Sequence, residues 1–327
     1  MTSTVPAAPA PAVATVPRAT LPVSKGHGTQ NDFVLLDDRS GALDLSAPLV
    51  RALADRRAGV GGDGVIRVVA SERLPEGADV LAQEPAARWF MDYRNADGSV
   101  AEMCGNGVRV FAAFLERLGL WDGTGELALG TRAGVRRVRR VPVPAGVDDD
   151  AWYAVDMGRW TLPGGAQALA DGFDAEVTVR GLPVTRPALG VDVGNPHTVL
   201  ALADESELAA ADLTTAPDVV PVPPHGTNVE LVVPLGEERL DDGPVGRVRM
   251  RVHERGVGET RSCGTGACAA ALAVRSWAGS GAPDVWLVDV PGGTVRVTAL
   301  PDGHVELAGP AVLVADATVD VTALVRS

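Results

Sequence analysis

The sequence contains two copies of one pattern, in which a polar loop runs into Cys-Gly-x-Gly and then into an amphipathic helix. The first copy carries Cys104 and the second carries Cys263, close to half the chain length further on. About four helical turns after each cysteine stands a glycine that is suited to end the helix, Gly119 in the first copy and Gly279 in the second. Such self-similarity predicts two duplicated domains with a site between them.

A thiol at the start of a helix has a defined chemistry. The free N–H groups and the positive end of the helix dipole favour the thiolate, so we expect a lowered pKa for both Cys104 and Cys263. The adjacent glycines let a substrate carboxylate approach the backbone amides closely. If the two halves face each other, one thiolate can remove an α-proton while the other thiol returns a proton to the opposite face, which inverts the carbon.

Two other interpretations of Cys104 and Cys263 stay open. A cysteine before Gly-x-Gly can be a small buried residue at a tight turn. Cys104 and Cys263 can also form a disulfide as an oxidation product. Cys268 lies among alanines in the predicted helix, so we expect a core residue there rather than a metal ligand.

The remaining pattern is rich in short strands bounded by Gly, Pro and Asp, which predicts an α+β fold. The predicted strands cover 33–36, 64–69, 88–93, 135–143, 152–157, 176–179, 197–203, 228–233, 248–253, 285–290, 294–298 and 305–307. The predicted helices cover 48–57, 107–118, 206–211 and 266–277.

Charge and cysteine content exclude several classes of protein. With 29 Lys and Arg against 42 Asp and Glu, the net charge of −13 disfavours binding to nucleic acid or anionic lipid. No apolar run is long enough to span a membrane. Three cysteines in 327 residues argue against a disulfide framework and for a reducing, cytoplasmic environment. Residues 1–22 are rich in Pro, Ala and Thr, and we expect a disordered or extended tail there.

The sequence indicates chemistry without a cofactor. Lys25 is the only lysine, and its position at the entry to a strand is unsuited to pyridoxal phosphate. We find no phosphate-binding loop, no dinucleotide fingerprint after a strand and no metal-ligand cluster. The predicted reaction therefore depends on side chains and helix ends alone.

Eight motifs in a fixed order resemble the diaminopimelate epimerase family. They lie at residues 25–33, 59–64, 95–99, 104–107, 194–197, 227–228, 254–256 and 263–266. The resemblance implies cofactor-independent interconversion of LL- and meso-2,6-diaminoheptanedioate, in lysine and peptidoglycan precursor biosynthesis. It also implies two pseudo-symmetric domains, each a barrel-like sheet around a central helix. We expect these at 23–155, completed by about 304–322, and at 156–303, and we expect a homodimer.

The resemblance also implies roles for individual residues. Cys104 and Cys263 match the acid/base pair, Cys104 acting on the LL form and Cys263 on the meso form. His197 is a candidate to line the site. The matching substrate-binding positions are Asn31, Asn95, Gly105, Asn106, Asn195, Asn228, Glu254, Arg255, Gly264 and Thr265. Gly64 departs from the pattern, because some members carry a substrate-contacting glutamine there.

Other functions compete with this one. A proline racemase or hydroxyproline epimerase would use the same fold and paired cysteines. A thiol redox protein would use Cys104 and Cys263 as a reversible disulfide, and a binding protein would hold the same ligand without chemistry. Arg255 and Glu254, together with the asparagines, favour a substrate that has a second amino-acid end.

Overall fold

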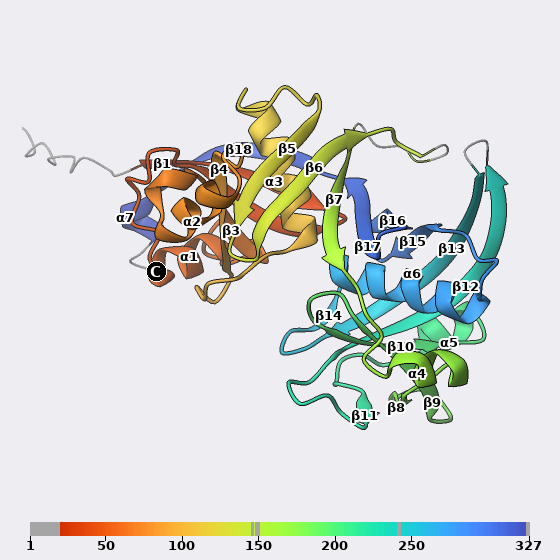
Figure 1. The fold of residues 1–327 in the computed structure, drawn as a ribbon. Helices are drawn as coiled ribbons and strands as arrows, with labels where there is room; N and C mark the ends of the chain where they lie inside the picture. Colours follow the sequence, from red (N-terminus) through yellow and green to blue (C-terminus); the bar gives the residue numbers. More distant parts are fainter. Residues whose placement is uncertain (1–19, 145–146, 148–150, 241–242, 325–327) are drawn as a thin grey trace, which may run out of the picture.

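A computed structural model describes residues 20–144, 147, 151–240 and 243–324. These residues form an α+β fold of two lobes, each with one long helix against curved sheet (Figure 1). Most of the predicted tail, residues 1–19, lies outside the described residues, while residues 20–22 form the start of strand β1 (Thr20–Gly28).

The first lobe surrounds helix α3 (Gly105–Arg117), whose residues are buried from its first glycine to Leu115. Strands contribute from both ends of the chain, because β1 pairs with β18 (Val312–Asp320). The other strands of this lobe are β2 (Asn31–Asp37), β3 (Gly64–Ala70), β4 (Trp89–Asn95), β5 (Glu126–Thr131), β6 (Gly134–Val141) and β7 (Trp152–Arg159). Helices α1 (Ala47–Ala54), α2 (Pro75–Gln83) and α7 (Val321–Leu324) lie outside this sheet (Figure 1).

The second lobe surrounds helix α6 (Gly264–Ala278), which contacts strands on several sides. Those strands are β9 (Arg186–Asp192), β10 (Pro196–Ala201), β12 (Asn228–Leu240), β13 (Gly243–Glu254), β15 (Val285–Val290), β16 (Gly293–Ala299) and β17 (His304–Pro310). Shorter elements complete the lobe, namely β8 (Ala175–Thr178), β11 (Asp218–Val220), β14 (Gly258–Thr260), α4 (Gly165–Asp171) and α5 (Glu205–Ala210).

The two lobes repeat one topology around their helices. In the first, β2 runs parallel to β3, and β4 returns antiparallel to β3 and ends at Asn95. In the second, β10 runs parallel to β12, and β13 returns antiparallel to β12 and ends at Glu254. The two residues that stand nine positions before the cysteines are therefore the last residues of equivalent strands. This confirms the duplication that the sequence predicts.

Strands β7 and β17 join the lobes. β7 pairs with β6 on one side and with β17 on the other, and β17 pairs in turn with β16. The apolar residues that cover α3 and α6 form one continuous buried cluster, which includes Phe111, Met157, Leu272 and Leu307. Both helices are thus fixed relative to the same pair of strands.

All predicted strands overlap observed ones, and all four predicted helices are present. The structure adds β1, β5, β9, β11, β14 and β18, with α2, α4, α7 and a short 3₁₀ turn at Ser71–Arg73. Several of these strands carry Gly, Pro or Ala, which weaken the local strand signal and leave pairing with neighbours to decide the conformation. The predicted helix 48–57 ends early, at Ala54, since Asp55 has extended backbone.

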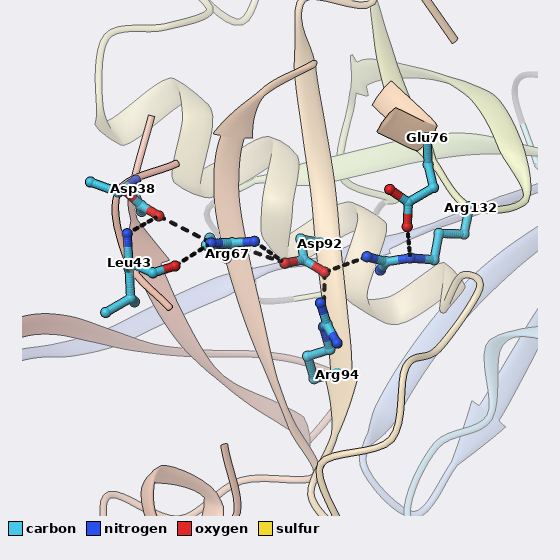
Figure 2. Close-up of polar contacts among 8 residues, drawn as sticks. Asp38, Leu43, Arg67, Glu76, Asp92, Arg94 and Arg132 are labelled. Carbon is cyan, nitrogen blue, oxygen red and sulfur yellow. Dashed lines mark hydrogen bonds and ion pairs between the residues drawn. The ribbon is translucent and has the colours of Figure 1, made fainter. Parts of the chain in front are cut away.

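A buried ionic cluster fixes β3 and β4 away from the cysteines (Figure 2). Asp92 is fully buried and accepts hydrogen bonds from Arg67 at 2.6 and 3.0 Å, from Arg94 at 3.0 Å and from Arg132 at 2.8 Å. Asp38 accepts from Arg67 at the far end of the row. Because every carboxylate is matched by guanidinium groups, the cluster stays charged without a lone buried ion.

No helix in the described part of the chain is both long and apolar enough to cross a membrane.

Candidate active site

Both cysteines cap the start of a central helix. Cys104 and Cys263 have extended backbone and directly precede α3 and α6. The Cys263 thiol accepts a hydrogen bond from the amide of Gly266 at 3.3 Å and lies 3.6 Å from the hydroxyl of Thr265. The repeated Cys-Gly-x-Gly pattern is therefore a pair of equivalent helix starts, and all three cysteines of the chain are free thiols.

The two helix starts meet. The side-chain amide of Asn106 donates to the carbonyl oxygen and the hydroxyl of Ser262, each at 3.2 Å. A Cβ on Gly264 would lie 3.0 Å from Cδ2 of Leu307, and one on Gly105 would lie 3.1 Å from the same atom. The duplicated motifs thus lie against one another across a single side chain of β17, as a site between the lobes requires.

A polar network supports Cys104 from the ends of β2 and β3. The Cys104 thiol lies 3.4 Å from Oδ1 of Asn31, and the amide of Asn31 donates to Asp63 at 2.7 Å. Asp63 also accepts from Arg56 at 2.6 Å and from the backbone of Asp32 at 3.1 Å. Asp63 therefore organises the glycine loop and holds Asn31 in place beside the thiol.

Asn95 ends β4 at the same edge of the sheet. Its amide donates to the hydroxyl of Ser99 at 2.9 Å, and it pairs in register with Gly64. A Cβ on Gly64 would lie only 2.6 Å from the ring of Tyr93. The backbone oxygen of Arg94, at 2.5 Å from the same Cβ position, also leaves no room for a larger side chain at Gly64.

The equivalent edge of the second lobe carries a buried histidine. His197 is 1% exposed, and its Nδ1 lies 2.7 Å from Oε1 of Glu230. Its Nε2 lies 3.0 Å from Oδ1 of Asn195. His197 therefore connects a predicted substrate-binding residue to a carboxylate that sequence reasoning did not identify.

Asn228, Glu254 and Arg255 lie together at this edge. The amide of Asn228 donates to the carbonyl of Pro196 at 3.1 Å, and its Oδ1 accepts from the backbone of Arg255 at 3.0 Å. The carboxylate of Glu254 accepts from Thr260, and the exposed Arg255 side chain donates to the carbonyl of His225. The backbone amide of Arg255 thus fixes Asn228, while its guanidinium remains near the surface.

The prediction of lowered thiol pKa values is wrong for the free protein. Desolvation by burial raises the pKa of Cys104 to about 11, against the opposing hydrogen bonds from the amides of Gly107 and Asn106. Burial raises the pKa of Cys263 well above its usual value, and the charges of Glu254 and Glu230 add to the effect. The helix starts favour the thiolates, but loss of water outweighs them. Both groups are thiols at neutral pH in the free protein.

Glu254 acts on both thiols. Its negative charge raises the pKa of Cys104 as well as that of Cys263. Burial also raises the pKa of Glu254 itself, with Thr260 opposing the shift through a hydrogen bond. A cation placed beside this carboxylate would lower the pKa of both thiols together.

Sequence reasoning missed four polar residues that the structure brings to the site. They are Thr29, whose hydroxyl lies 2.5 Å from that of Ser262, then Ser262 itself, Tyr93 and Glu230. Glu230 had a detectable signal, because a carboxylate within the apolar run Val229-Glu230-Leu231-Val232 needs a buried partner. Cys268 is fully buried in the core, as predicted.

The described side chains near the cysteines do not form a metal-binding site. Among the described residues, no group of three or more His, Cys, Asp and Glu side chains lies close enough to hold one ion. Lys25 is engaged with Asp32 and with the carbonyl of Gly61. It lies within β1 and pairs with Val34 of β2.

Comparisons with known proteins agree with this geometry. A family model described as diaminopimelate epimerase matches residues 23–162 and 190–314. The diaminopimelate epimerase of Streptomyces coelicolor is 48% identical over 303 residues, covering 90% of this chain and 94% of that protein. The diaminopimelate epimerase of Rhodococcus jostii is 48% identical over 310 residues, covering 91% and 96%.

More distant solved structures share the fold. A PhzF-family phenazine biosynthesis protein of Bacillus anthracis has a TM-score of 0.57 at 15% identity, covering 92% of this chain and 99% of that one. A hydroxyproline epimerase of Agrobacterium vitis has a TM-score of 0.55 at 14% identity, covering 92% and 91%. At these identities the likeness establishes the two-lobed architecture alone.

Proposed function

The chain belongs to the diaminopimelate epimerase family, and on that premise we propose that Cys104 and Cys263 are the acid and base of its reaction. The protein is an isomerase that interconverts LL- and meso-2,6-diaminoheptanedioate, a step of lysine biosynthesis. The observation that carries the assignment of the cysteines is the direct contact between the two helix starts, through Asn106 and Ser262.

The proton balance needs one thiolate and one thiol. The thiolate of one cysteine takes the proton from the α-carbon, and the thiol of the other delivers its proton to the opposite face. The first cysteine is then a thiol and the second a thiolate, so the reverse reaction begins from that state. Cys104 starts as the base for the LL form and Cys263 for the meso form.

The carboxylate next to the reacting carbon binds at the helix starts. Backbone amides of Gly105 and Asn106 in α3, and of Gly264 and Thr265 in α6, are the donors for it. The first amides of a helix lack intrahelical partners and face the positive end of its dipole, so they stabilise the charge that develops as the α-proton leaves. The absence of a Cβ on Gly105 and Gly264 lets both helix starts pack closely against Leu307, which brings their amides to one site.

Binding of the ammonium group favours ionisation of one thiol, whose proton passes to the solvent. The substrate carries an ammonium beside the reacting carbon, and Glu254 is its proposed acceptor. Neutralising Glu254 removes a charge that raises the pKa of both thiols. The catalytic ionisation thus accompanies substrate binding, and the free protein keeps its cysteines protonated and unreactive.

The remaining polar residues bind the substrate. Arg255 holds a carboxylate, and His197 lines the site. The asparagines proposed to bind polar groups of the substrate are Asn31, Asn95, Asn195 and Asn228. Together these residues can bind both amino-acid ends of the substrate. Proline has only one such end.

The domain boundaries and assembly are part of the proposal. The first domain comprises residues 23–155 with 304–322, and the second comprises 156–303. Strand β17 lies at their junction, since it contacts both α3 and α6. The pairing of β1 with β18 supports the return of the chain to the first domain. We further propose that the enzyme works without a cofactor, as a cytoplasmic homodimer.

Proton exchange in D₂O tests the mechanism. Reduced protein is incubated with LL- or meso-2,6-diaminoheptanedioate, and α-deuterium and stereochemistry are followed by NMR and chiral chromatography. Wild type should epimerise with incorporation of solvent deuterium, while Cys104→Ser and Cys263→Ser should lose interconversion. Cys268→Ser is the matched control, because its thiol is buried in the core and should leave the rate unchanged.

Two results would redirect the proposal. Racemisation of proline or hydroxyproline, with diaminoheptanedioate untouched, would keep the fold and reject the substrate. Full activity in either active-site serine variant would reject the two-base mechanism.

A further inference from the structure

Glu230 is a buried carboxylate of the second lobe that has no role in the proposed reaction so far. It stands on β12, two residues after Asn228, and is fully buried. One carboxylate oxygen, Oε1, contacts Nδ1 of His197 at 2.7 Å. The other, Oε2, has no hydrogen-bond partner among the described residues. A fully ionised carboxylate in this position would leave a charged oxygen in a dry interior.

With Asn195 oriented as in the structure, the contacts of His197 set how many protons the His197–Glu230 pair holds. Nε2 faces Oδ1 of Asn195 at 3.0 Å, and an amide oxygen carries no hydrogen, so the proton lies on Nε2. The contact between Nδ1 and Oε1 of Glu230 needs a second proton, on either atom. With two protons shared between the imidazole and the carboxylic group, the pair has no net charge. Burial also raises the pKa of Glu230, which favours the same state.

Glu230 is also a neighbour of the catalytic thiol. A Cβ on Gly266 would lie 2.8 Å from Oε1 of Glu230 and 3.2 Å from the Cys263 thiol, so both atoms flank one glycine of α6. Among the described residues, the other charged group that faces this region is Glu254 on β13, which interacts electrostatically with Glu230 and His197 and also raises the pKa of Cys263. A net charge on the pair would act on Cys263 at short range.

We propose that Glu230 is a positioning residue that holds His197 protonated at Nε2 and thereby fixes the side chain of Asn195 with Nδ2 free to donate to a substrate carboxylate. Glu230 does not touch substrate in this arrangement. It acts through the imidazole of His197. The proton shared between the two groups leaves the pair without net charge beside Cys263. The inference rests on the proposed function only in assigning the carboxylate to the substrate.

The alternative has the Asn195 amide reversed. Its Nδ2 would then donate to an unprotonated Nε2, Nδ1–H would donate to an ionised Glu230, and Oδ1 would face the substrate to accept from an ammonium. The two arrangements differ in one proton and in which end of the substrate Asn195 recognises.

Two substitutions at one position separate these arrangements. Glu230→Gln can donate from its amide to Nδ1 and so keeps the proton on Nε2 without any titration. Glu230→Met fills similar volume but offers His197 no hydrogen bond. We expect Glu230→Gln to keep KM and kcat close to wild type. We expect Glu230→Met to raise KM on the order of 10- to 100-fold, with a smaller effect on kcat.

The control removes a largely buried carboxylate from another part of the fold. Glu306 on β17 is 9% exposed and pairs with Arg139, so Glu306→Gln reports the general effect of losing such a group. Thermal unfolding of all three variants separates folding from function. Equal impairment of Glu230→Gln and Glu230→Met would overturn the proposal, because it would mean that an ionised carboxylate is required.

A readout in the free protein makes the inference independent of catalysis. The ¹⁵N shifts of the His197 ring should show a protonated Nε2 at neutral pH in wild type and in Glu230→Gln. An unprotonated Nε2 in wild type would overturn the proposal even if Glu230→Met does not fold. Retention of activity in the cysteine variants would instead reject the proposed mechanism and leave this result standing.

Discussion

Asn106 donates from one side-chain nitrogen to both the carbonyl and the hydroxyl of Ser262, and so bonds the second residue after Cys104 to the residue before Cys263. The same side chain accepts from Arg109 through its oxygen. Asn106 is 1% exposed, so these bonds are shielded from water. The separation of the two cysteines is therefore set by a specific contact and not only by the packing of the lobes.

Removing this contact should cost activity more than stability. Asn106→Ala leaves the buried carbonyl of Ser262 without its donor, which should lower the free energy of unfolding by about 1–3 kcal/mol. Because the thiols must lie on opposite faces of one carbon, a small displacement should reduce kcat/KM on the order of 100-fold or more. Steady-state epimerisation and chemical denaturation measure the two effects.

Ser71→Ala is the control for this variant. The Ser71 hydroxyl is fully buried and donates to the carbonyl of Ala87 at 2.6 Å, far along the chain from the cysteine motifs. It should lose comparable stability and keep its activity. A parallel loss of activity in both variants would show that destabilisation alone explains the effect.

Glu254 should control the ionisation of both cysteines. In the free protein, alkylation of Cys104 by iodoacetamide should be slow at neutral pH and accelerate toward pH 11, since the thiolate is the nucleophile and the pKa of Cys104 is about 11. Glu254→Gln removes a negative charge that raises this pKa, so alkylation at pH 8 should become faster. Peptide mass spectrometry resolves the sites.

Cys268 provides the internal reference for that experiment. Its pKa is raised to about 12 by burial, and it lies in the core of α6. Its labelling should stay negligible in both proteins while the fold is intact. Unchanged alkylation of Cys104 and Cys263 in Glu254→Gln would contradict the coupling proposed for substrate binding.

The two motif glycines should respond differently to one methyl group. In Gly266→Ala the new Cβ would meet Oε1 of Glu230 at 2.8 Å and the Cys263 thiol at 3.2 Å, so it would displace a buried carboxylate and the catalytic cysteine. In Gly107→Ala it would meet the ends of Ile66 and Met91, both at 3.2 Å, and Cβ of Cys104 at an ordinary contact distance of 3.4 Å. The two side-chain ends can shift slightly. We expect kcat/KM to fall on the order of 100-fold for Gly266→Ala and much less for Gly107→Ala. Equal losses would show that the glycines serve only backbone approach by substrate.

The duplicated motif was predictable because its signals are local. Helix starts, helix-ending glycines and the spacing from Asn95 and Glu254 to the cysteines can all be read within short segments. Strands such as β5 and β9 were not predicted, since Gly, Pro and Ala give little strand preference and pairing across the sheet decides their conformation.

The thiol pKa values illustrate what a sequence does not contain. The favourable helix start is a local property, whereas the raised pKa values come from burial in the folded protein and from charge. Glu254 acts on both thiols, and Glu230 acts on Cys263. Likewise, the contact of Ser262 with Asn106 depends on how the lobes meet. Burial and charges from other parts of the fold therefore raise the thiol pKa values, whereas the local sequence pattern predicted lowered values.

The buried cluster around Asp92 should contribute to stability in a pH-dependent way. Burial opposes ionisation of Asp92, but Arg132, Arg67 and Arg94 outweigh it and hold the pKa of this carboxyl below its usual range. A group with a lowered pKa in the folded state stabilises the fold fully above its unfolded pKa of about 3.9. That contribution is lost as the pH falls through the lower, folded-state pKa.

Asp92→Asn should therefore be costly at neutral pH and less so in acid. Removing the shared carboxylate leaves three guanidinium groups around a neutral side chain, which should lower the free energy of unfolding by about 3–5 kcal/mol at pH 7. Below pH 4 the wild type loses the same contribution, so the difference between the two proteins should shrink. Urea denaturation of both proteins across this range measures it. A difference that is independent of pH would mean that the loss comes from packing and not from the charge of Asp92.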